Sequence, residues 1–468
     1  MKHRNWKSKS KARKNAVPSK QPGNDGMPKI RALVAGIDVG SEEHYVCAPS
    51  GDGGTERRAY GTTTPDLQAI LEWLQEAHVE SVAMESTGVY WIPLFELLNS
   101  QGMEVILVDT RQFDRVPGRK TDAEDCQWIQ QLHSCGLLQG CFRPQDIICH
   151  LRSLVREKAV FVAEQADWLR RMQKCLDQMN VRVHRAVSDI NGTTGMAILR
   201  AIVAGERDPV QLAKLRDPRC QKGPATMIQE LTGNWRADHL FNLEQGLKMY
   251  DTLAEHIADY QREIQRRIEA MRCEKADRQP LQPVKNKEKA KAIKRRNQEP
   301  MRRVLHGMTG VDLTTIDGIG VETAEIIQSE YGTDLHEFPG ERQFVKHLRL
   351  APRQSITGGK PQRKGKGKKS VTRAGQALKM AATSLRRSRT ALGAYYRKMA
   401  AHKDSATAVF ATARKMAQYV YRLLRYGQAY VDEGAVAYEQ RYEAARLNRT
   451  AATADQLGYK LVPKTATT

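Results

Sequence analysis

The stretch RALVAGIDVG, residues 31–40, decides the fold of the first part of the chain. Its apolar run ends at a glycine, which is typical of a buried strand followed by a turn. Asp38 falls at the end of that strand, where a side chain faces the edge of a sheet. The next stretch, EEHYVCAPS at residues 42–50, predicts the second strand of a hairpin.

Strands and helices then alternate along the chain as far as residue 136. Apolar residues at helical spacing predict three helices, and short apolar runs predict two more strands. In chain order these are DLQAILEWLQEA (66–77, helix), VESVAMES (79–86, strand), WIPLFELLNSQG (91–102, helix), EVILVDT (104–110, strand) and KTDAEDCQWIQQLHSCG (120–136, helix). This alternation predicts a mainly parallel, layered α/β sheet.

The rest of the chain has a helical pattern. Two long charged helices, Leu151–Met179 and Leu243–Met271, are expected to form an extended α-hairpin or a coiled coil, within or between chains. A compact all-α domain follows. The expected divisions are a disordered basic arm (1–31), an α/β domain (32–145), a helical coiled-coil region with a basic linker (146–303), a C-terminal domain (304–440) and a tail (441–468).

Positive charge is concentrated in three stretches of the chain. Lys and Arg outnumber Asp and Glu by 75 to 53, a net charge of +22. Residues 1–31 carry +9, residues 283–303 carry +7 and residues 353–373 carry +8, which leaves −2 for the remainder. Charge gathered in this way predicts a polyanionic partner, nucleic acid first and an acidic membrane surface second.

Other classes of protein are disfavoured by composition. No apolar run approaches the roughly 20 residues of a membrane-spanning helix, and the N-terminus has no apolar signal segment. The eight cysteines form no CxxC pair, which argues against a zinc site or a disulfide framework. We therefore expect a cytoplasmic, nucleoid-associated protein that has reduced thiols and no contact with a membrane.

Four carboxylates stand at positions from which they can converge. Asp38 and Glu85 end two predicted strands, whereas Asp122 and Asp125 share one face at the start of a predicted helix. Four such acids repel one another unless cations neutralise them, so the set predicts two divalent ions suited to phosphodiester cleavage. From spacing alone, the simpler interpretation as helix caps or solvated acids is favoured.

A glycine-rich turn lies in LTTIDGIGVETAEIIQSEYG, residues 313–332. Gly318 and Gly320 separate two short helical patterns, as in a helix-hairpin-helix element. Glycine N–H groups and the following helix N-terminus can approach a phosphate closely without reading base sequence. The alternative is a packing motif in which the glycines only make the turn.

A pair of hydroxyl side chains precedes a basic run in LAPRQSITGGKPQRKGKGKKSVTRAG, residues 350–375. Ser355 and Thr357 stand just before a glycine pair, and either hydroxyl could attack phosphorus beside a bound phosphate. Spacing alone favours an ordinary polar turn. The residues expected to bind nucleic acid in the run are Lys360, Arg363, Lys364, Lys366, Lys368 and Lys369.

In this order the motifs resemble one family of mobile-element enzymes. GIDVGSEEHYVCA, AMESTGVYWIPLFELL, GRKTDAED, IDGIG, LRLAPRQSITGGK and RAGQALKMAATSLRRSRTALGAYYRKM together resemble the DEDD transposases of the insertion-sequence one-ten / eleven-eleven family. The resemblance covers residues 32–440. It implies an RNase H/RuvC-like N-terminal domain, a coiled-coil middle and a C-terminal transposase domain, in an enzyme that cleaves and rejoins DNA to mobilise an insertion sequence.

The resemblance also implies roles for particular residues. Asp38, Glu85, Asp122 and Asp125 would bind Mg²⁺, as two ions. The family places a catalytic serine directly before the glycine of the C-terminal motif, and here Thr357 occupies that position. The threonine methyl group restricts χ1 and crowds the attack, so Ser355 remains the second candidate nucleophile.

The implied partners are nucleic acids and further copies of the chain. They are donor and target DNA, a structured non-coding guide RNA in some members, and a homo-oligomer, dimer or tetramer. Two other functions remain open from the residues: a structure-selective nuclease like a Holliday-junction resolvase, which uses the acids and water alone, and a non-catalytic nucleic-acid scaffold.

Overall fold

The computed structural model describes residues 28–86, 88–109, 122–284, 286–352, 356–357, 360–361, 371–427, 444, 447–448 and 450–462. The side chains of residues 122–124, 275, 278, 356–357 and 360–361 are outside this description. Two compact units make up the chain, and the boundary between them falls between Arg143 and Pro144. Most of the expected basic arm and much of the expected tail lie outside the described residues.

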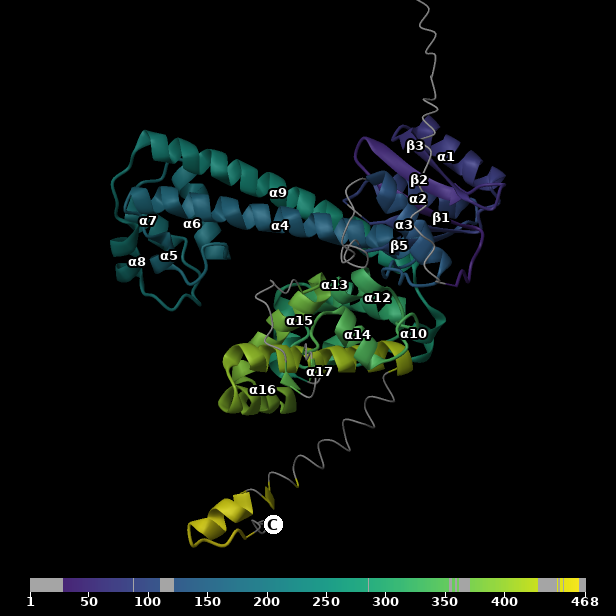
Figure 1. Ribbon diagram of the computed structural model, residues 1–468. Helices are drawn as coiled ribbons and strands as arrows, with labels where there is room; N and C mark the ends of the chain where they lie inside the picture. The colour runs from purple at the N-terminus through teal and green to yellow at the C-terminus, as the bar shows by residue number, and fades with distance from the viewer. Residues whose placement is uncertain are drawn as a thin grey trace, which may run out of the picture. The chain divides into compact units, whose positions relative to one another are not determined.

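The first unit contains a five-stranded mixed sheet (Figure 1). In spatial order the strands are β3 (Thr55–Gly61), β2 (Glu43–Pro49), β1 (Val34–Val39), β4 (Ser81–Glu85) and β5 (Glu104–Val108). The β1–β4 and β4–β5 pairs are parallel, whereas the β1–β2 and β2–β3 pairs are antiparallel. The mixed order fits an RNase H-like domain.

The predicted hairpin of β1 and β2 is confirmed, but the sheet is not mainly parallel, because strand β3 was not predicted and adds a second antiparallel pair. Its sequence, TERRAYG, is largely exposed and carries charges at successive positions. An edge strand of this kind lacks the apolar alternation on which strand prediction depends. The other four strands and all three helices of this unit lie where the sequence predicts them.

Helices cover both faces of the sheet. Helices α1 (Thr64–Glu76) and α2 (Trp91–Ser100) pack on the face that carries Ile37 and Met84. Helix α3 (Asp122–Ser134) packs on the opposite face, where Ala83 and Val108 meet Ile129 and Leu132. Because side chains alternate along a strand, residues two apart share a face, and this fixes which strand residues meet α3.

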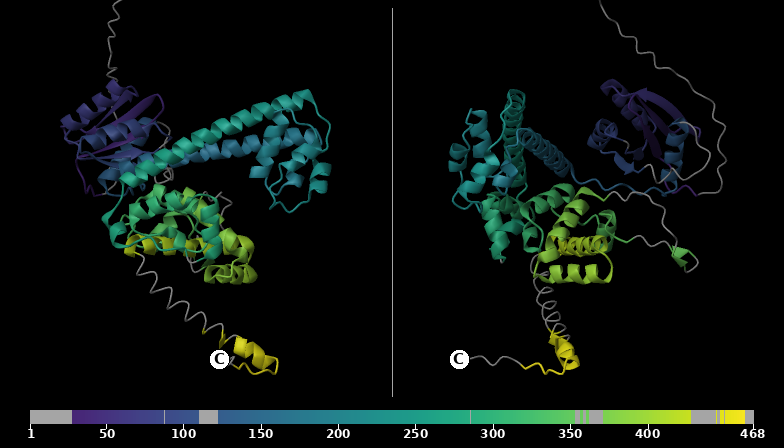
Figure 2. Two further views of the ribbon diagram at one scale, coloured as in Figure 1. Left: turned by 180° about the vertical axis from the view of Figure 1, so that it is seen from behind. Right: turned by 90° about the vertical axis from the view of Figure 1, so that its left-hand side faces the viewer.

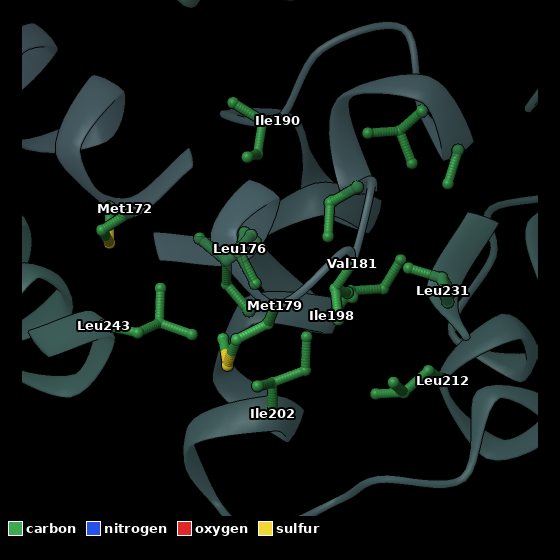
Figure 3. Close-up of a cluster of buried hydrophobic side chains, with 14 of the residues drawn as sticks. Met172, Leu176, Met179, Val181, Ile190, Ile198, Ile202, Leu212, Leu231 and Leu243 are labelled. Carbon is green, nitrogen blue, oxygen red and sulfur yellow. The ribbon is translucent and has the colours of Figure 1, made fainter. Parts of the chain in front are cut away.

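The second unit begins with two long helices that pack along each other, α4 (Asp146–Gln178) and α9 (Ala237–Ala270) (Figures 1 and 2). Helices α5 (Val183–Ala186), α6 (Thr193–Val203), α7 (Pro209–Lys214) and α8 (Pro224–Leu231) connect them. The four short helices and the adjoining ends of α4 and α9 form a lobe whose apolar core includes Leu176, Ile198, Leu231 and Leu243 (Figure 3). The two long helices are confirmed as an intrachain pair, and coiled-coil packing between chains stays a prediction.

The remaining elements form a C-terminal helical part. They are α10 (Glu274–Arg278), α11 (Lys287–Arg295), α12 (Glu299–Thr309), the 3-10 turn η2 (Leu313–Thr315), α13 (Val321–Tyr331), α14 (Glu341–His347), the two-residue strands β6 (Ile356–Thr357) and β7 (Lys360–Pro361), α15 (Arg373–Ser384), the 3-10 turn η3 (Leu385–Arg387), α16 (Ala391–His402) and α17 (Ser405–Tyr426). In the part of the chain that the structure describes, no helix has the length and apolar character needed to span a membrane.

Candidate active site

Two of the four predicted acids lie side by side on the sheet. Ile37 of β1 is paired with Met84 of β4 in parallel register, so the next residues, Asp38 and Glu85, are neighbours across the two strands. Neighbouring strands lie about 4.8 Å apart. Since Ile37 and Met84 face α1 and α2, alternation places both acids on the other face, which α3 covers.

Helix α3 lies directly on strand β1 at Gly36. A Cβ built on Gly36 would come within 2.3 Å of both the Cys126 carbonyl oxygen and the Gln130 amide nitrogen. Only a glycine therefore permits this approach of helix backbone to strand backbone. Asp125 precedes Cys126 directly, and so the start of α3 is held over the same face of the sheet that carries Asp38.

Electrostatics support this proximity. Burial raises the pKa of the Cys126 thiol, and the neighbouring Cys47 and the Asp38 carboxylate raise it further. An effect of this kind requires the Asp38 carboxylate to lie near the first turns of α3. The structure thus brings Asp38, Glu85 and the helix that carries Asp125 to one region.

The fourth acid and the metal ions lie beyond what the structure describes. Helix α3 begins at Asp122, but the Asp122 side chain is outside the description. Glu85 is 8% exposed, and Asp38 and Asp125 are partly buried. Among the described side chains, no three His, Cys, Asp or Glu residues are grouped closely enough to hold a metal ion. The metal site remains a prediction.

The structure adds residues that the sequence analysis did not select. Asp109 follows β5, the third strand of the parallel set, so it stands at the same sheet edge as Asp38 and Glu85. The sequence feature that marks Asp109 is an acid directly after the apolar run EVILV, and the same kind of feature identified Asp38. Tyr45 is the antiparallel partner of Asp38 in β2 and therefore shares its face.

An exposed apolar loop follows Glu85. Val89 is 65% exposed and Tyr90 is 47% exposed. Trp91 instead packs edge-on against Phe95, with ring centroids 5.7 Å apart, and its indole N–H donates to the Gly88 carbonyl. Tyr90 is thus available to a ligand near the acids, whereas Trp91 is a packing residue.

Comparison with known families identifies the chain. A model of DEDD transposases of the IS110 type, described as a transposase, matches residues 35–181, and a second, described as the transposase IS116/IS110/IS902 family, matches residues 310–397. Together they cover about half of the chain. The chain belongs to the IS110 family of transposases. No curated protein matches it.

This membership makes the protein a DNA-cleaving and rejoining enzyme with DNA as its substrate. The first matched region of the transposase includes the sheet, α3 and α4, so it contains all four predicted acids. The second matched region contains the glycine turn, the candidate hydroxyls and helix α15. The family resemblance inferred from the motifs is confirmed.

The candidate nucleophile of the transposase lies in a short β-hairpin of the second unit. Strands β6 and β7 are antiparallel, with Thr357 paired to Lys360 at the backbone and two residues between them. The other residues predicted to act in this segment lie outside the described residues, namely Ser355, Arg363, Lys364, Lys366, Lys368 and Lys369. Their assignment stays a prediction.

The glycine turn at Gly318 packs closely against α15 and η3. Gly318 has a φ of +84°, and a Cβ there would lie 3.0 Å from the Ala381 carbonyl oxygen and 3.1 Å from Leu385. Gly318 therefore faces α15 and η3. Gly320, which caps α13, has nothing within 4 Å of its built Cβ, so only the Gly320 side of the turn has space for a phosphate.

Two cations of the expected basic linker are internal to the fold. Lys289 Nζ donates to the carbonyls of Thr314 and Ile316, at 2.5 and 3.0 Å, and burial lowers the pKa of Lys289. Arg302 is 4% exposed and pairs with Asp312 at 2.6 Å. These side chains hold the residues just before Gly318 and do not face a polyanion.

A second network ties α4 to α13. Glu330 accepts from the Arg156 guanidinium at 2.8 and 2.9 Å and pairs with Arg152 at 3.2 Å. Arg373, at the start of α15, donates to the Val155 carbonyl and lies 4.0 Å from Glu330. The residue that ends the hydroxyl-bearing segment is thereby anchored to helix α4.

Proposed function

We propose that this transposase cleaves DNA at a divalent-metal centre held by Asp38, Glu85, Asp122 and Asp125, and that Thr357 supplies the attacking hydroxyl. The observation that carries the proposal is the adjacency of Asp38 and Glu85 on the face of the sheet against which α3 brings Asp125. The strand-end acids of β1 and β4 and the first turn of α3 supply only carboxylate oxygens, the ligands that Mg²⁺ prefers.

The donor set fits such ions. Two adjacent carboxylates, one of them 8% exposed, repel each other in surroundings of reduced polarity unless a cation shares them. Bound Mg²⁺ ions would stabilise the charge that develops on the phosphate oxygens. The fixed backbone contact between α3 and β1 would keep the acids in one arrangement, which limits the reorganisation needed when substrate binds.

The hydroxyl acts as a nucleophile in this proposal. The Thr357 Oγ1 bonds to phosphorus as its proton leaves, and a deoxyribose oxygen departs and takes up a proton. The product is a phosphothreonine ester between protein and DNA, which conserves the bond energy for rejoining. The position of Thr357 in the matched C-terminal region, beside glycines and a basic run, supports this role.

We propose further partners on the same grounds. A structured guide RNA and a homo-oligomer follow from the family resemblance, and the basic stretches 1–31 and 353–373 are suited to phosphate backbones. RNA that copurifies with the protein and survives a high-salt wash supports the guide. Light scattering of the purified protein gives the oligomeric state.

The test is to trap the covalent intermediate on a nicked suicide DNA substrate in Mg²⁺. Wild-type protein is expected to form the adduct, and both Asp38→Asn and Thr357→Ala are expected to abolish it. Glu72→Gln, an exposed acid on α1, is the matched control and should form it normally.

Three other outcomes would reassign the chemistry. An adduct that persists in Thr357→Ala but is lost in Ser355→Ala makes Ser355 the nucleophile. Metal-dependent cleavage without any adduct indicates a resolvase-like nuclease that uses water. DNA activities that are unchanged in Asp38→Asn would refute the carboxylate centre altogether.

A further inference from the structure

Helices α15–α17 carry positive charge that does not occur as a run of consecutive basic residues. Residues 371–427 contain twelve Lys or Arg residues and a single acid, Asp404, a net charge of +11. The densest part is residues 386–403, which we call the α16 cationic segment. It contains six Lys or Arg residues and no acid. In the basic stretches 1–31 and 353–373, most of the charge falls on residues outside the description, whereas this segment is described throughout.

Part of the charge on α15–α17 is used inside the fold. Arg373 pairs with Glu330 and Arg422 pairs with Glu341 at 2.8 Å. Lys379 and Lys415 lie over the rings of Phe410 and Tyr395. None of these cations belongs to the α16 cationic segment.

The six cations of the α16 cationic segment are all exposed to solvent: Arg386, Arg387, Arg389, Arg397, Lys398 and Lys403. The nearest acid in sequence, Asp404, is committed to capping α17, since its carboxylate accepts from the Thr407 N–H and hydroxyl at 2.7 Å each. These hydrogen bonds lower the pKa of Asp404 and keep it ionised. The ionised Asp404 offsets one of the six positive charges, so residues 386–404 retain a net charge of +5.

The fold concentrates four of these cations at one turn. Arg386 and Arg387 belong to η3, and Arg389 lies in the connection to α16. The Arg397 guanidinium reaches back from α16 and donates to the carbonyls of Arg386 and Ser388, at 3.3 and 2.5 Å. Residues eight to eleven positions apart in sequence are thereby held together, and Lys398 on α16 and its C-cap Lys403 add two further exposed cations.

We propose that the α16 cationic segment binds the phosphate backbone of double-stranded DNA. The proposal rests on the proposed function for the existence of a DNA substrate and assigns to it residues outside the hydroxyl-bearing stretch 350–375. Guanidinium groups suit phosphate because they donate in a planar fork. Such contacts position DNA and do not specify its sequence.

The experiment measures affinity for a fixed DNA duplex against salt concentration in EDTA, so that chemistry does not contribute. The slope of log K against log salt is negative, and the triple variant Arg386→Gln/Arg387→Gln/Arg389→Gln should reduce its magnitude by about 2.7, or about 0.9 per lost phosphate contact. The matched control is Arg262→Gln/Arg266→Gln/Arg267→Gln on α9, which removes three exposed arginines already paired with Asp259 and Glu263. Its slope should stay near that of the wild type.

A second variant guards against misfolding of the first. Lys398→Gln/Lys403→Gln should reduce the magnitude of the slope by about 1.8 and leave the thermal unfolding midpoint unchanged. The proposal is overturned if both variants have the wild-type slope for duplex DNA. It is also overturned if the slope of the α9 control falls in magnitude as much as that of the triple variant. If the variants instead lose affinity only for an RNA stem-loop of the same length, the surface belongs to RNA. Because binding is measured without metal, failure here leaves the adduct test of the proposed function intact.

Discussion

Substitution of Gly36 by alanine tests whether the placement of α3 on the sheet organises the acids. The added Cβ would lie 2.3 Å from the Cys126 carbonyl oxygen and from the Gln130 amide nitrogen, and 2.8 Å from the Gln130 Cα. All three are backbone atoms, so no side-chain rotation relieves the contact. Ordinary contact needs at least 3.4 Å, and α3 must therefore withdraw from β1 by about 1 Å.

Two effects of different size follow from that movement. Overpacking of this kind costs about 1–3 kcal/mol of unfolding free energy, because the contacts of Ile129 and Leu132 with the sheet loosen as well. Displacement of Asp125 by about 1 Å from Asp38 and Glu85 should slow cleavage roughly 100-fold, since catalytic groups must be held more closely than that. The larger effect on rate is therefore expected in protein that is still folded.

The assay combines urea denaturation with single-turnover DNA cleavage at a temperature where Gly36→Ala remains folded. Gly51→Ala is the matched control, because Gly51 is in the same unit, has ordinary backbone dihedrals and has nothing within 4 Å of its built Cβ. Wild-type stability in Gly36→Ala would refute the contact of α3 with β1. Lower stability combined with a wild-type cleavage rate would refute the dependence of catalysis on the placement of Asp125.

Three further predictions concern the stability and the nucleic-acid binding of the same chain. Glu330→Gln should lower the unfolding free energy of the second unit by about 3 kcal/mol in urea, because it leaves Arg152 and Arg156 without their shared acid. Glu263→Gln on α9 should have little effect, and equal losses in the two variants would argue against the α4–α13 network. Gly318→Ala should lower the thermal midpoint because of its positive φ and its contact with Ala381, while Gly320→Ala should not; a midpoint unchanged in both would refute the packing role. Removal of residues 1–31 should reduce the salt dependence of DNA binding, and an unchanged slope would count against the arm.

A pH effect is expected in the first unit. Burial lowers the pKa of His133, whose Nε2 lies 2.9 Å from the Ser81 hydroxyl. A histidine with a lowered folded-state pKa contributes stability above its unfolded pKa of about 6.5, and that stability is lost as pH falls toward the folded value. The urea midpoint should therefore fall between pH 7 and pH 5, and by less in His133→Gln. Identical pH profiles for the two proteins would show that His133 is not the titrating group.

Strand ends were predictable from the sequence, whereas contacts between elements were not. The apolar runs before Asp38 and Glu85 identify β1 and β4, and the acids at their ends follow at once. Gly36 inside an apolar strand indicates a close backbone approach, but the sequence does not say that α3 makes it. Strand β3 was missed because this edge strand has three consecutive charges and no buried residue, and so gives no apolar alternation.

Counting charge along the chain misjudged which cations are available to a polyanion. Lys289 and Arg302 contribute to the +7 of residues 283–303, yet both are directed into the fold, toward carbonyls and a carboxylate. The α16 cationic segment went unnoticed because its arginines and lysines are interspersed with Ala, Leu and Tyr. Helical turns gather residues that the sequence spaces apart, so local density along the chain is a poor measure of charge density on a surface.

This division of cations bears on how the second unit of the transposase responds to salt. The buried Arg302 and the partly buried Arg152 are paired with carboxylates and stabilise the arrangement of α4, α12 and α13. They are therefore insensitive to salt, because buried pairs are weakly screened. Cations on the α16 cationic segment remain exposed and unbalanced, and their attraction to DNA should weaken with every increase in ionic strength. DNA binding through this segment should thus be lost at salt concentrations at which the arrangement of α4, α12 and α13 is unchanged.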